Sequence, residues 1–337
     1  MTEIRPLIAE TVSRSFGDHT AVDSASLTLV PGEITALIGQ SGSGKTTFLR
    51  LLAGMERPDQ GRILSGETVL ASARQHVPID KRKIGLVFQD FALFPHLTVL
   101  ENVMFGLRAL TRPERVQTAE QWLERLGLTG RRDAYPHHLS GGEQQRTAIA
   151  RALAPQPVAI LLDEPFSGLD PTMRDRVRDV ALSAVREAGI PALLVTHDAT
   201  EALVHADTIA VIEQGVILQS GPPEQVYRQP TSLDVARALG PVHKIGASAL
   251  PADWHTAIAS NSETLWYRPE AIQIGAGKAL KVTDSKLAGP VTELALSLSA
   301  TETIYAACQP GSPITAGDQV NASINPALFF DFASKST

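Results

Sequence analysis

Short apolar runs alternate with segments of helical composition through the larger, N-terminal part of the chain. Runs at Ile34–Ile38, Val158–Leu162 and Ala192–Thr196 have the length of buried strands rather than of helices. Thr46–Ala53 and Glu114–Leu128 lie between such runs and have helical composition. Buried strands that alternate with helices form a mainly parallel sheet covered on both faces. The pattern therefore predicts an α/β domain.

The amino-acid composition of the sequence changes near residue 240. The following part is rich in Thr, Ser, Gly, Ala and Val, and strand-length runs such as Thr264–Tyr267, Val291–Leu298 and Thr303–Cys308 are separated by turn residues. That spacing predicts a small β-barrel or sandwich. We therefore expect two domains, 1–238 and 239–337.

Composition narrows the class of protein. The net charge of the 337-residue chain is −6, whereas nucleic-acid binders usually show a basic face. The lone Cys308 favours a reducing compartment. The sequence shows neither a signal-peptide pattern nor a run of about 18 apolar residues, the length a membrane span needs. If the protein serves a membrane process, we expect other chains to supply the membrane path.

A phosphate-binding loop is the strongest chemical signal. Residues 39–46 read Gly-Gln-Ser-Gly-Ser-Gly-Lys-Thr, which fits the pattern G-x-x-x-x-G-K-[ST]. Glycines let backbone N–H groups turn towards phosphate oxygens, and the following helix directs its positive end at the same anion. Lys45 adds a full positive charge, and the Thr46 hydroxyl is suited to Mg²⁺. The loop follows an apolar strand and precedes a helix, so we expect Mg-ATP there.

Polar residues at other strand ends could complete that site. Asp163 and Glu164 end an apolar run, where Asp163 would face Mg²⁺ and Glu164 would act as general base on water. His197 would sense the γ-phosphate, and Gln89 would bind Mg²⁺ or the attacking water. Taken alone, two carboxylates also form ordinary solvated turns, and a lone histidine is more often structural. The phosphate loop in the same chain favours the catalytic interpretation.

A second anion-binding helix start points to a dimer. Leu139–Arg146 reads Leu-Ser-Gly-Gly-Glu-Gln-Gln-Arg, so Ser140 and two glycines open a helix. One nucleotide needs one phosphate cradle, and a second is explained if it closes on the nucleotide of a partner chain. The plainer alternative is a well-capped helix, which does not account for both glycines and the polar residues after them.

With these motifs in order, residues 1–240 resemble the nucleotide-binding domain of ABC transporters. The resemblance implies a P-loop ATPase with a mainly parallel sheet and helical and antiparallel β subdomains. It implies catalysis by Glu164, His197 and Lys45. It assigns ATP contacts to Phe16, Gly39, Gln40, Ser41, Gly42, Ser43, Gly44, Lys45, Thr46, Thr47 and Gln89. It assigns Mg²⁺ to Thr46, Gln89 and Asp163.

The same resemblance implies how two chains meet. The signature contacts across the dimer would be Ser140, Gly141, Gly142 and Glu143. The D-loop contacts would be Ser167, Gly168, Leu169 and Asp170. Phe16 stands where many members have Tyr, and Glu143 stands where many have Gln. Both are compatible with ATP hydrolysis.

Further segments are similar to import ATPases. Phe88–Val99 matches the loop that binds a short helix of the membrane subunit, and Tyr267–Ile272 with Ala316–Val320 matches their OB-like, TOBE-type accessory β-barrel. The resemblance implies a homodimer on the cytoplasmic face of the membrane. It also implies integral membrane permease subunits, a periplasmic or extracellular solute-binding protein, and no nucleic acid.

The choice of solute depends on likeness alone, because the ATPase does not touch the solute. Met55–Gly61, Val77-Pro78 with Lys81-Arg82, and Arg268-Pro269-Glu270 are most like ferric-iron importer ATPases. Sulfate, molybdate, polyamine and thiamine importers share much of this pattern. Two alternatives differ in class. A soluble ABC ATPase of ribosomes or DNA usually has two cassettes or long coiled coils, and basic surfaces. The intact Lys45, Asp163, Glu164 and His197 speak against an inactive interaction module.

Overall fold

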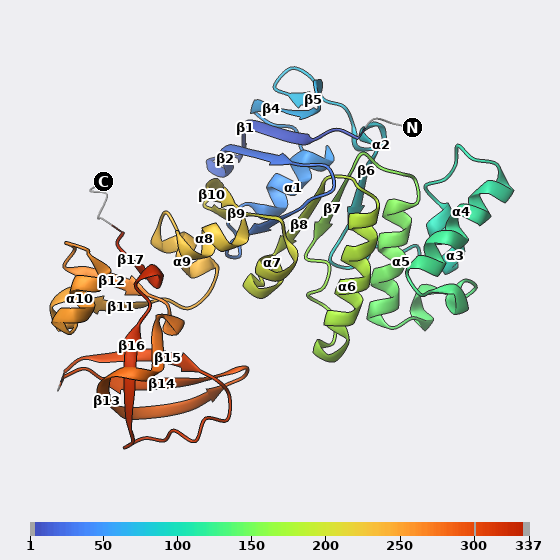
Figure 1. Cartoon of the computed structure of the whole chain (residues 1–337). Helices are drawn as coiled ribbons and strands as arrows, with labels where there is room; N and C mark the ends of the chain where they lie inside the picture. The colour runs from blue at the N-terminus through green and yellow to red at the C-terminus, as the bar shows by residue number, and fades with distance from the viewer. Residues whose placement is uncertain (1–3, 300, 333–337) are drawn as a thin grey trace. The chain divides into compact units, whose positions relative to one another are not determined.

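The chain forms two compact units that divide between Pro223 and Glu224. The computed structural model describes residues 4–299 and 301–332. Each unit has its own apolar core. Figure 1 labels the helices and strands of both units. The sequence pattern placed the boundary after residue 238, whereas residues 224–238 pack within the second unit.

A six-stranded sheet is the framework of the first unit. Its order is β10-β9-β3-β8-β7-β6, and all neighbours are parallel except β10 and β9. The strands are β3 (Ile34–Ile38), β6 (Ile84–Val87), β7 (Ala159–Asp163), β8 (Ala192–Thr196), β9 (Thr208–Glu213) and β10 (Val216–Gly221). The predicted mainly parallel sheet is therefore confirmed.

An antiparallel sheet and a group of helices complete this unit. The antiparallel sheet has the order β2-β1-β4-β5 and contains β1 (Leu7–Phe16), β2 (His19–Leu29), β4 (Gln60–Ser65) and β5 (Thr68–Ser72). The helices are α1 (Lys45–Ala53), α2 (Ile79–Arg82), α3 (Val99–Met104), α4 (Arg112–Arg125), α5 (Gly141–Leu153), α6 (Pro171–Glu187) and α7 (Ala199–His205). Helices α3, α4 and α5 pack on one another and form the helical subdomain.

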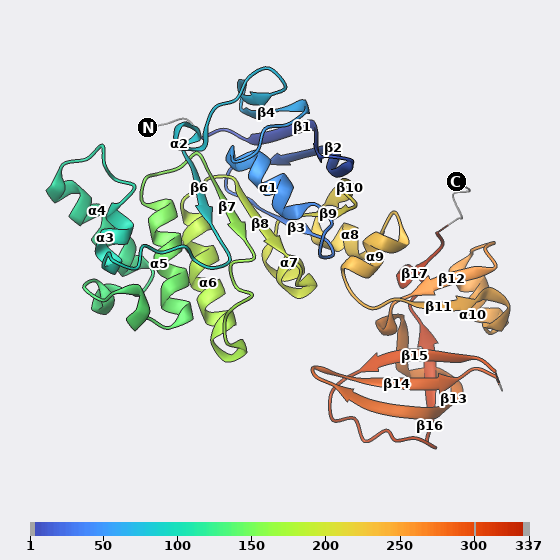
Figure 2. The ribbon, with the colours of Figure 1, turned by 180° about the vertical axis from the view of Figure 1, so that it is seen from behind.

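Alternation along the central strands separates two cores. Leu161 and Leu193 join the cluster that contains α1 and the antiparallel sheet. Their neighbours Ile160 and Leu194 join the cluster that contains α3 to α6. Successive strand residues point to opposite faces, so the parallel sheet is covered on both sides (Figures 1 and 2). This explains why these strands are uniformly apolar in the sequence.

The second unit is mainly antiparallel β, as the sequence predicts. Its sheets have the orders β11-β12-β17 and β15-β14-β13-β16. The strands are β11 (His243–Gly246), β12 (Thr264–Tyr267), β13 (Ile272–Ala288), β14 (Val291–Ser297), β15 (Thr303–Cys308), β16 (Gln319–Ile324) and β17 (Phe329–Phe330). The helices are α8 (Pro223–Arg228), α9 (Leu233–Ala238) and α10 (Ala252–Ile258).

A buried arginine joins α8 and α9 to the β-structure of this unit. Arg268 is fully buried, and its guanidinium lies 3.8 Å from the ring centre of Tyr227. Its Nη2 donates to the carbonyl oxygens of Tyr227 at 3.3 Å and Ala236 at 3.2 Å. The Tyr227 hydroxyl donates to Glu270. These bonds explain why residues 224–238 belong with the second unit.

We expect Arg268→Met to lower the free energy of unfolding of the second unit by about 2–4 kcal/mol. The substitution removes a cation–π contact and the guanidinium hydrogen bonds to the carbonyl oxygens of Tyr227 and Ala236. Urea unfolding of the full chain, followed by the fluorescence of Trp254 and Trp266, measures the change.

Arg237→Met is the matched control for that measurement. Arg237 is exposed and lies over the Trp266 ring at 5.2 Å, so its loss should cost at most about 1 kcal/mol. Equal effects of the two substitutions would contradict the role of Arg268.

Candidate functional site

The phosphate loop follows β3 and leads into α1, as the sequence predicts. A Cβ at Gly39 would lie 2.2 Å from the carbonyl oxygen of Ile212, and one at Gly44 would lie 2.4 Å from that of Ala21. Gly44 also has a φ of +105°, which side chains disfavour. These two glycines are therefore required by the close approach of neighbouring backbone and not only by the phosphate.

Lys45 is held inside the loop that it follows. Its Nζ donates to the carbonyl oxygens of Gly39 and Gln40, each at 2.8 Å, and the residue is only 7% exposed. Burial lowers the pKa of Lys45, and the carboxylates of Glu164 and Asp163 act in the opposite direction. A cation that is fixed and partly desolvated interacts strongly with an incoming phosphate.

Two carboxylates lie at the carboxyl end of β7. Burial, followed by the charge of Glu164, raises the pKa of Asp163. Glu164 has a left-handed φ of +44°, and its N–H donates to the carbonyl of Val195 on β8 at 3.0 Å. Strained backbone of this kind is concentrated at functional sites. The Glu164 carboxylate lies 3.0 Å from Nδ1 of His197, which follows β8.

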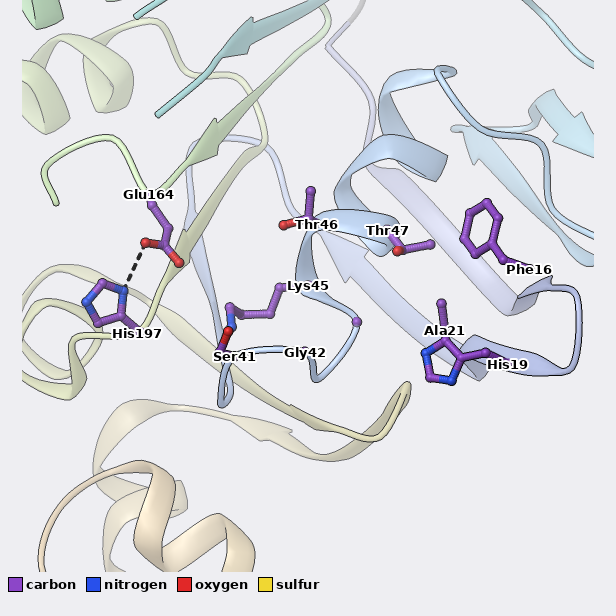
Figure 3. A pocket seen from close by; sticks show the side chains of 11 residues that line it. Phe16, His19, Ala21, Ser41, Gly42, Lys45, Thr46, Thr47, Glu164 and His197 are labelled. Carbon is purple, nitrogen blue, oxygen red and sulfur yellow. Dashed lines mark hydrogen bonds and ion pairs between the residues drawn. The ribbon is translucent and has the colours of Figure 1, made fainter. Parts of the chain in front are cut away.

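A cavity of about 520 Å³ extends from the phosphate loop to Glu164 and His197 (Figure 3). It is lined by Phe16, His19, Ala21, Ser41, Gly42, Gly44, Lys45, Thr46, Thr47, Glu164 and His197. The structure thus brings the phosphate loop, the expected base and the expected histidine together. His19 and Ala21 are not among the site residues predicted from the sequence. The one signal for them in the sequence was that they follow Phe16 closely.

The signature segment starts α5 and is tightly capped. The Ser140 N–H and hydroxyl both donate to the Glu143 carboxylate, at 2.8 and 2.9 Å, and the Glu143 N–H donates back to Ser140 Oγ at 3.4 Å. Arg131 donates to the same carboxylate at 2.8 Å. Burial works against ionisation, yet these hydrogen bonds lower the pKa of Glu143. Glu143 thus caps its own helix in this chain.

The D-loop adjoins both the carboxylates and the signature. Ser167 Oγ donates to the Glu164 carbonyl at 3.0 Å, and Asp170 caps α6 by accepting from the Thr172 N–H at 2.9 Å. A Cβ at Gly141 would lie 3.4 Å from the side chain of Leu169. The D-loop therefore packs against the start of α5 within one chain.

Gln89 lies in an exposed turn after β6 and is not among the residues that line the described cavity. Beyond it, Phe91 and Ala92 have left-handed φ values of +61° and +45°. Arg151, near the end of α5, donates to both of their carbonyl oxygens, at 3.0 and 2.6 Å. Arg151 has no local signal in the sequence, because its partners lie about sixty positions away.

Of the three residues predicted to bind Mg²⁺, Thr46 lines the described cavity, whereas Asp163 and Gln89 are not among its lining residues. Over residues 4–299 and 301–332, no group of three or more His, Cys, Asp or Glu side chains could hold a metal by itself. Mg²⁺ needs only one or two carboxylates beside waters and phosphate oxygens. Asp163, the Thr46 hydroxyl and the Gln89 amide oxygen are ligands of that kind.

No helix within the same described ranges is long and apolar enough to cross a bilayer.

Comparison with known proteins agrees with these features. Residues 22–167 match the ABC transporter family, and residues 267–330 match the TOBE domain. The chain is 43% identical over 257 residues to the Fe(3+) ions import ATP-binding protein FbpC of Brucella melitensis, covering 75% of this chain and 72% of the relative. It is 39% identical over 295 residues to the Agrobacterium fabrum protein of the same name, covering 82% of each.

A solved structure is similar to the first unit. It is a dimeric, post-hydrolysis ATP-binding cassette bound to ADP and Pi, with a TM-score of 0.57 and 29% sequence identity. The match covers 64% of this chain and 98% of the cassette.

We expect Gly39→Ala to destabilise the first unit by about 1–3 kcal/mol and to weaken ATP binding, because the added Cβ would overlap the Ile212 carbonyl. Thermal unfolding and calorimetric titration of ATP measure the two effects. Gly130→Ala is the control, since a Cβ there would have nothing within 4 Å and its φ is not left-handed. A Gly39→Ala protein that matched this control in both measurements would contradict the steric argument.

Proposed function

Because the chain belongs to the ATP-binding subunits of ABC transporters, we propose that it powers the import of ferric iron. Members of this family hydrolyse ATP, so the proposal concerns the identity of the transported solute. The observation that carries the proposal is the identity to Fe(3+) import ATP-binding proteins, which spans both units and reaches 82% of the Agrobacterium relative's length.

Within the site, we propose that Lys45 and the loop N–H groups bind the β- and γ-phosphates. Thr46, Asp163 and Gln89 would hold Mg²⁺, which neutralises phosphate charge when bound. Glu164 takes the proton of the attacking water as the water oxygen bonds to the γ-phosphorus. The bond from that phosphorus to the β–γ bridging oxygen breaks, which releases ADP and phosphate. The Glu164 carboxylate is oriented by His197 at 3.0 Å, and the Glu164 backbone by the Val195 carbonyl.

We propose further that two chains share each nucleotide. The start of α5, with Ser140, Gly141, Gly142 and Glu143, would contact ATP held by the phosphate loop of the partner chain. The capped helix start offers N–H groups and a positive dipole end to the γ-phosphate. The dimeric state of the similar cassette supports this arrangement.

The remaining partners follow from the importer proposal. Permease subunits would bind the segment 88–99 at the helical subdomain, where a groove is lined by Leu97, Met104 and Phe105 together with Arg108 and Arg112. A periplasmic or extracellular binding protein would deliver the solute to the permease. The chain would then lie peripherally on the cytoplasmic face of the membrane.

We expect Glu164→Gln to retain ATP binding while slowing hydrolysis by about 10²–10⁴-fold, because the amide cannot accept the proton of water. The variant should accumulate as an ATP-bound dimer. Single-turnover hydrolysis and size-exclusion chromatography with Mg-ATP measure the two outcomes. In the trapped dimer, cysteines placed at Ser140 and Ser41 should cross-link between chains. Unchanged turnover would remove Glu164 as the base.

The solute is tested in the reconstituted transporter. We expect iron-loaded binding protein to stimulate ATP hydrolysis by the complete complex in proteoliposomes, whereas sulfate, molybdate, polyamine and thiamine should not. The Glu164→Gln complex is the control for hydrolysis that comes from other enzymes. Stimulation by one of the other solutes, with none by iron, would reassign the substrate and leave the ATPase mechanism intact.

A further inference from the structure

The hairpin of β1 and β2 carries two rings to the edge of the nucleotide cavity. Phe16 ends β1, His19 begins β2, and the two are directly paired across the turn formed by Gly17 and Asp18. Gly17 has a φ of +59°, which such a tight turn demands. Residues directly opposite in an antiparallel pair project to the same face. The hairpin therefore presents both rings together.

Both rings lie at the end of the cavity that is remote from the catalytic carboxylate. Figure 3 shows Phe16 and His19 on one side of the phosphate loop, and Glu164 and His197 on the other. With the γ-phosphate directed at Glu164, the adenosine of the nucleotide lies at the hairpin end. This step rests on the proposed function, which sets the direction of the nucleotide.

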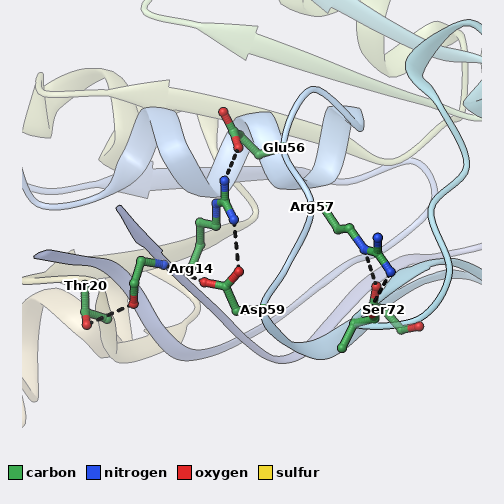
Figure 4. A network of polar contacts seen from close by, with 8 residues as sticks. Arg14, Thr20, Glu56, Arg57, Asp59 and Ser72 are labelled. Carbon is green, nitrogen blue, oxygen red and sulfur yellow. Dashed lines mark hydrogen bonds and ion pairs between the residues drawn. The ribbon is translucent and has the colours of Figure 1, made fainter. Parts of the chain in front are cut away.

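One face of the Phe16 ring is already covered. The guanidinium of Arg14 lies 4.7 Å from the ring centre and is bound by Glu56 at 3.0 Å and Asp59 at 2.9 Å (Figure 4). Asp59 also accepts the Ser15 N–H at 2.8 Å. Two carboxylates thus fix the cation, and the cation fixes the ring. This leaves the opposite face of the Phe16 ring for stacking with the nucleobase.

We propose that His19 is a second ring contact for adenosine, so that the hairpin holds the nucleoside with Phe16 and His19 together. Arg14 is the positioning residue that sets the plane of Phe16. The phosphates are bound separately, by the loop around Lys45. Adenosine and phosphate contacts therefore come from different segments and can be weakened independently.

The test compares two ligands that share the phosphates and differ in adenosine. The dissociation constants of ADP and of inorganic tripolyphosphate are measured for the full-length chain by competition with a fluorescent nucleotide. His19→Ala should weaken ADP binding about tenfold, the size expected for one lost ring contact, and leave tripolyphosphate unchanged. Arg14→Met should weaken ADP about two- to fivefold without affecting tripolyphosphate.

Matched variants separate a ring contact from other effects. His19→Phe should keep ADP binding within about twofold of the original, and His19→Asn should not. His255→Ala, on α10 of the other unit, should leave both ligands unchanged. Unchanged ADP binding in His19→Ala, equal weakening of both ligands, or rescue by Asn instead of Phe would overturn the proposal.

Lys45→Ala distinguishes this inference from the proposed site itself. It should weaken both ADP and tripolyphosphate, because it removes a phosphate contact. If it does so while His19→Ala has no effect, the nucleotide site stands and His19 is not part of it. If Lys45→Ala leaves both ligands unchanged, the proposed orientation and this inference fail together.

Discussion

The parallel pairing of β3, β8 and β7 determines where the residues of the candidate site meet. Ile38 is paired with Thr196, and Asp163 with Val195, so the carboxyl ends of all three strands lie at one edge of the sheet. The phosphate loop follows β3, Glu164 follows β7, and His197 follows β8. A shift of one residue in this register would turn side chains to the opposite face. The buried, uniformly apolar strands keep the register by packing on both faces.

That edge also explains which parts of the site could be predicted from sequence. The phosphate loop, Asp163 and Glu164 are local patterns that follow apolar runs, and the strands predicted around them lie within a residue or two of their observed bounds. His19 depends on hairpin pairing, and Arg151 on carbonyl groups about sixty positions away. Contacts of that kind leave no local pattern, so sequence reasoning could not find them.

Helix α5 connects two surfaces that are expected to have different partners. Its first turn is the signature, capped by Ser140 and Glu143. Near its other end, Arg151 holds the left-handed backbone of Phe91 and Ala92, within the segment proposed to face the permease. The helix has thirteen residues and is about 20 Å long, so these two contacts lie at opposite ends of one helix. The signature and the permease-facing loop are thus parts of one packed element.

The place of Arg268 has a consequence for how such chains can be recombined. The Arg268 guanidinium donates hydrogen bonds to backbone carbonyls of α8 and α9. Those helices should therefore be transferred together with the β-structure that follows them. A graft that exchanged accessory domains at residue 238 would separate a buried cation from its carbonyl partners. A junction at Pro223 takes Arg268 and both of its carbonyl partners from the same parent protein. It is therefore the suitable junction for hybrid transporters.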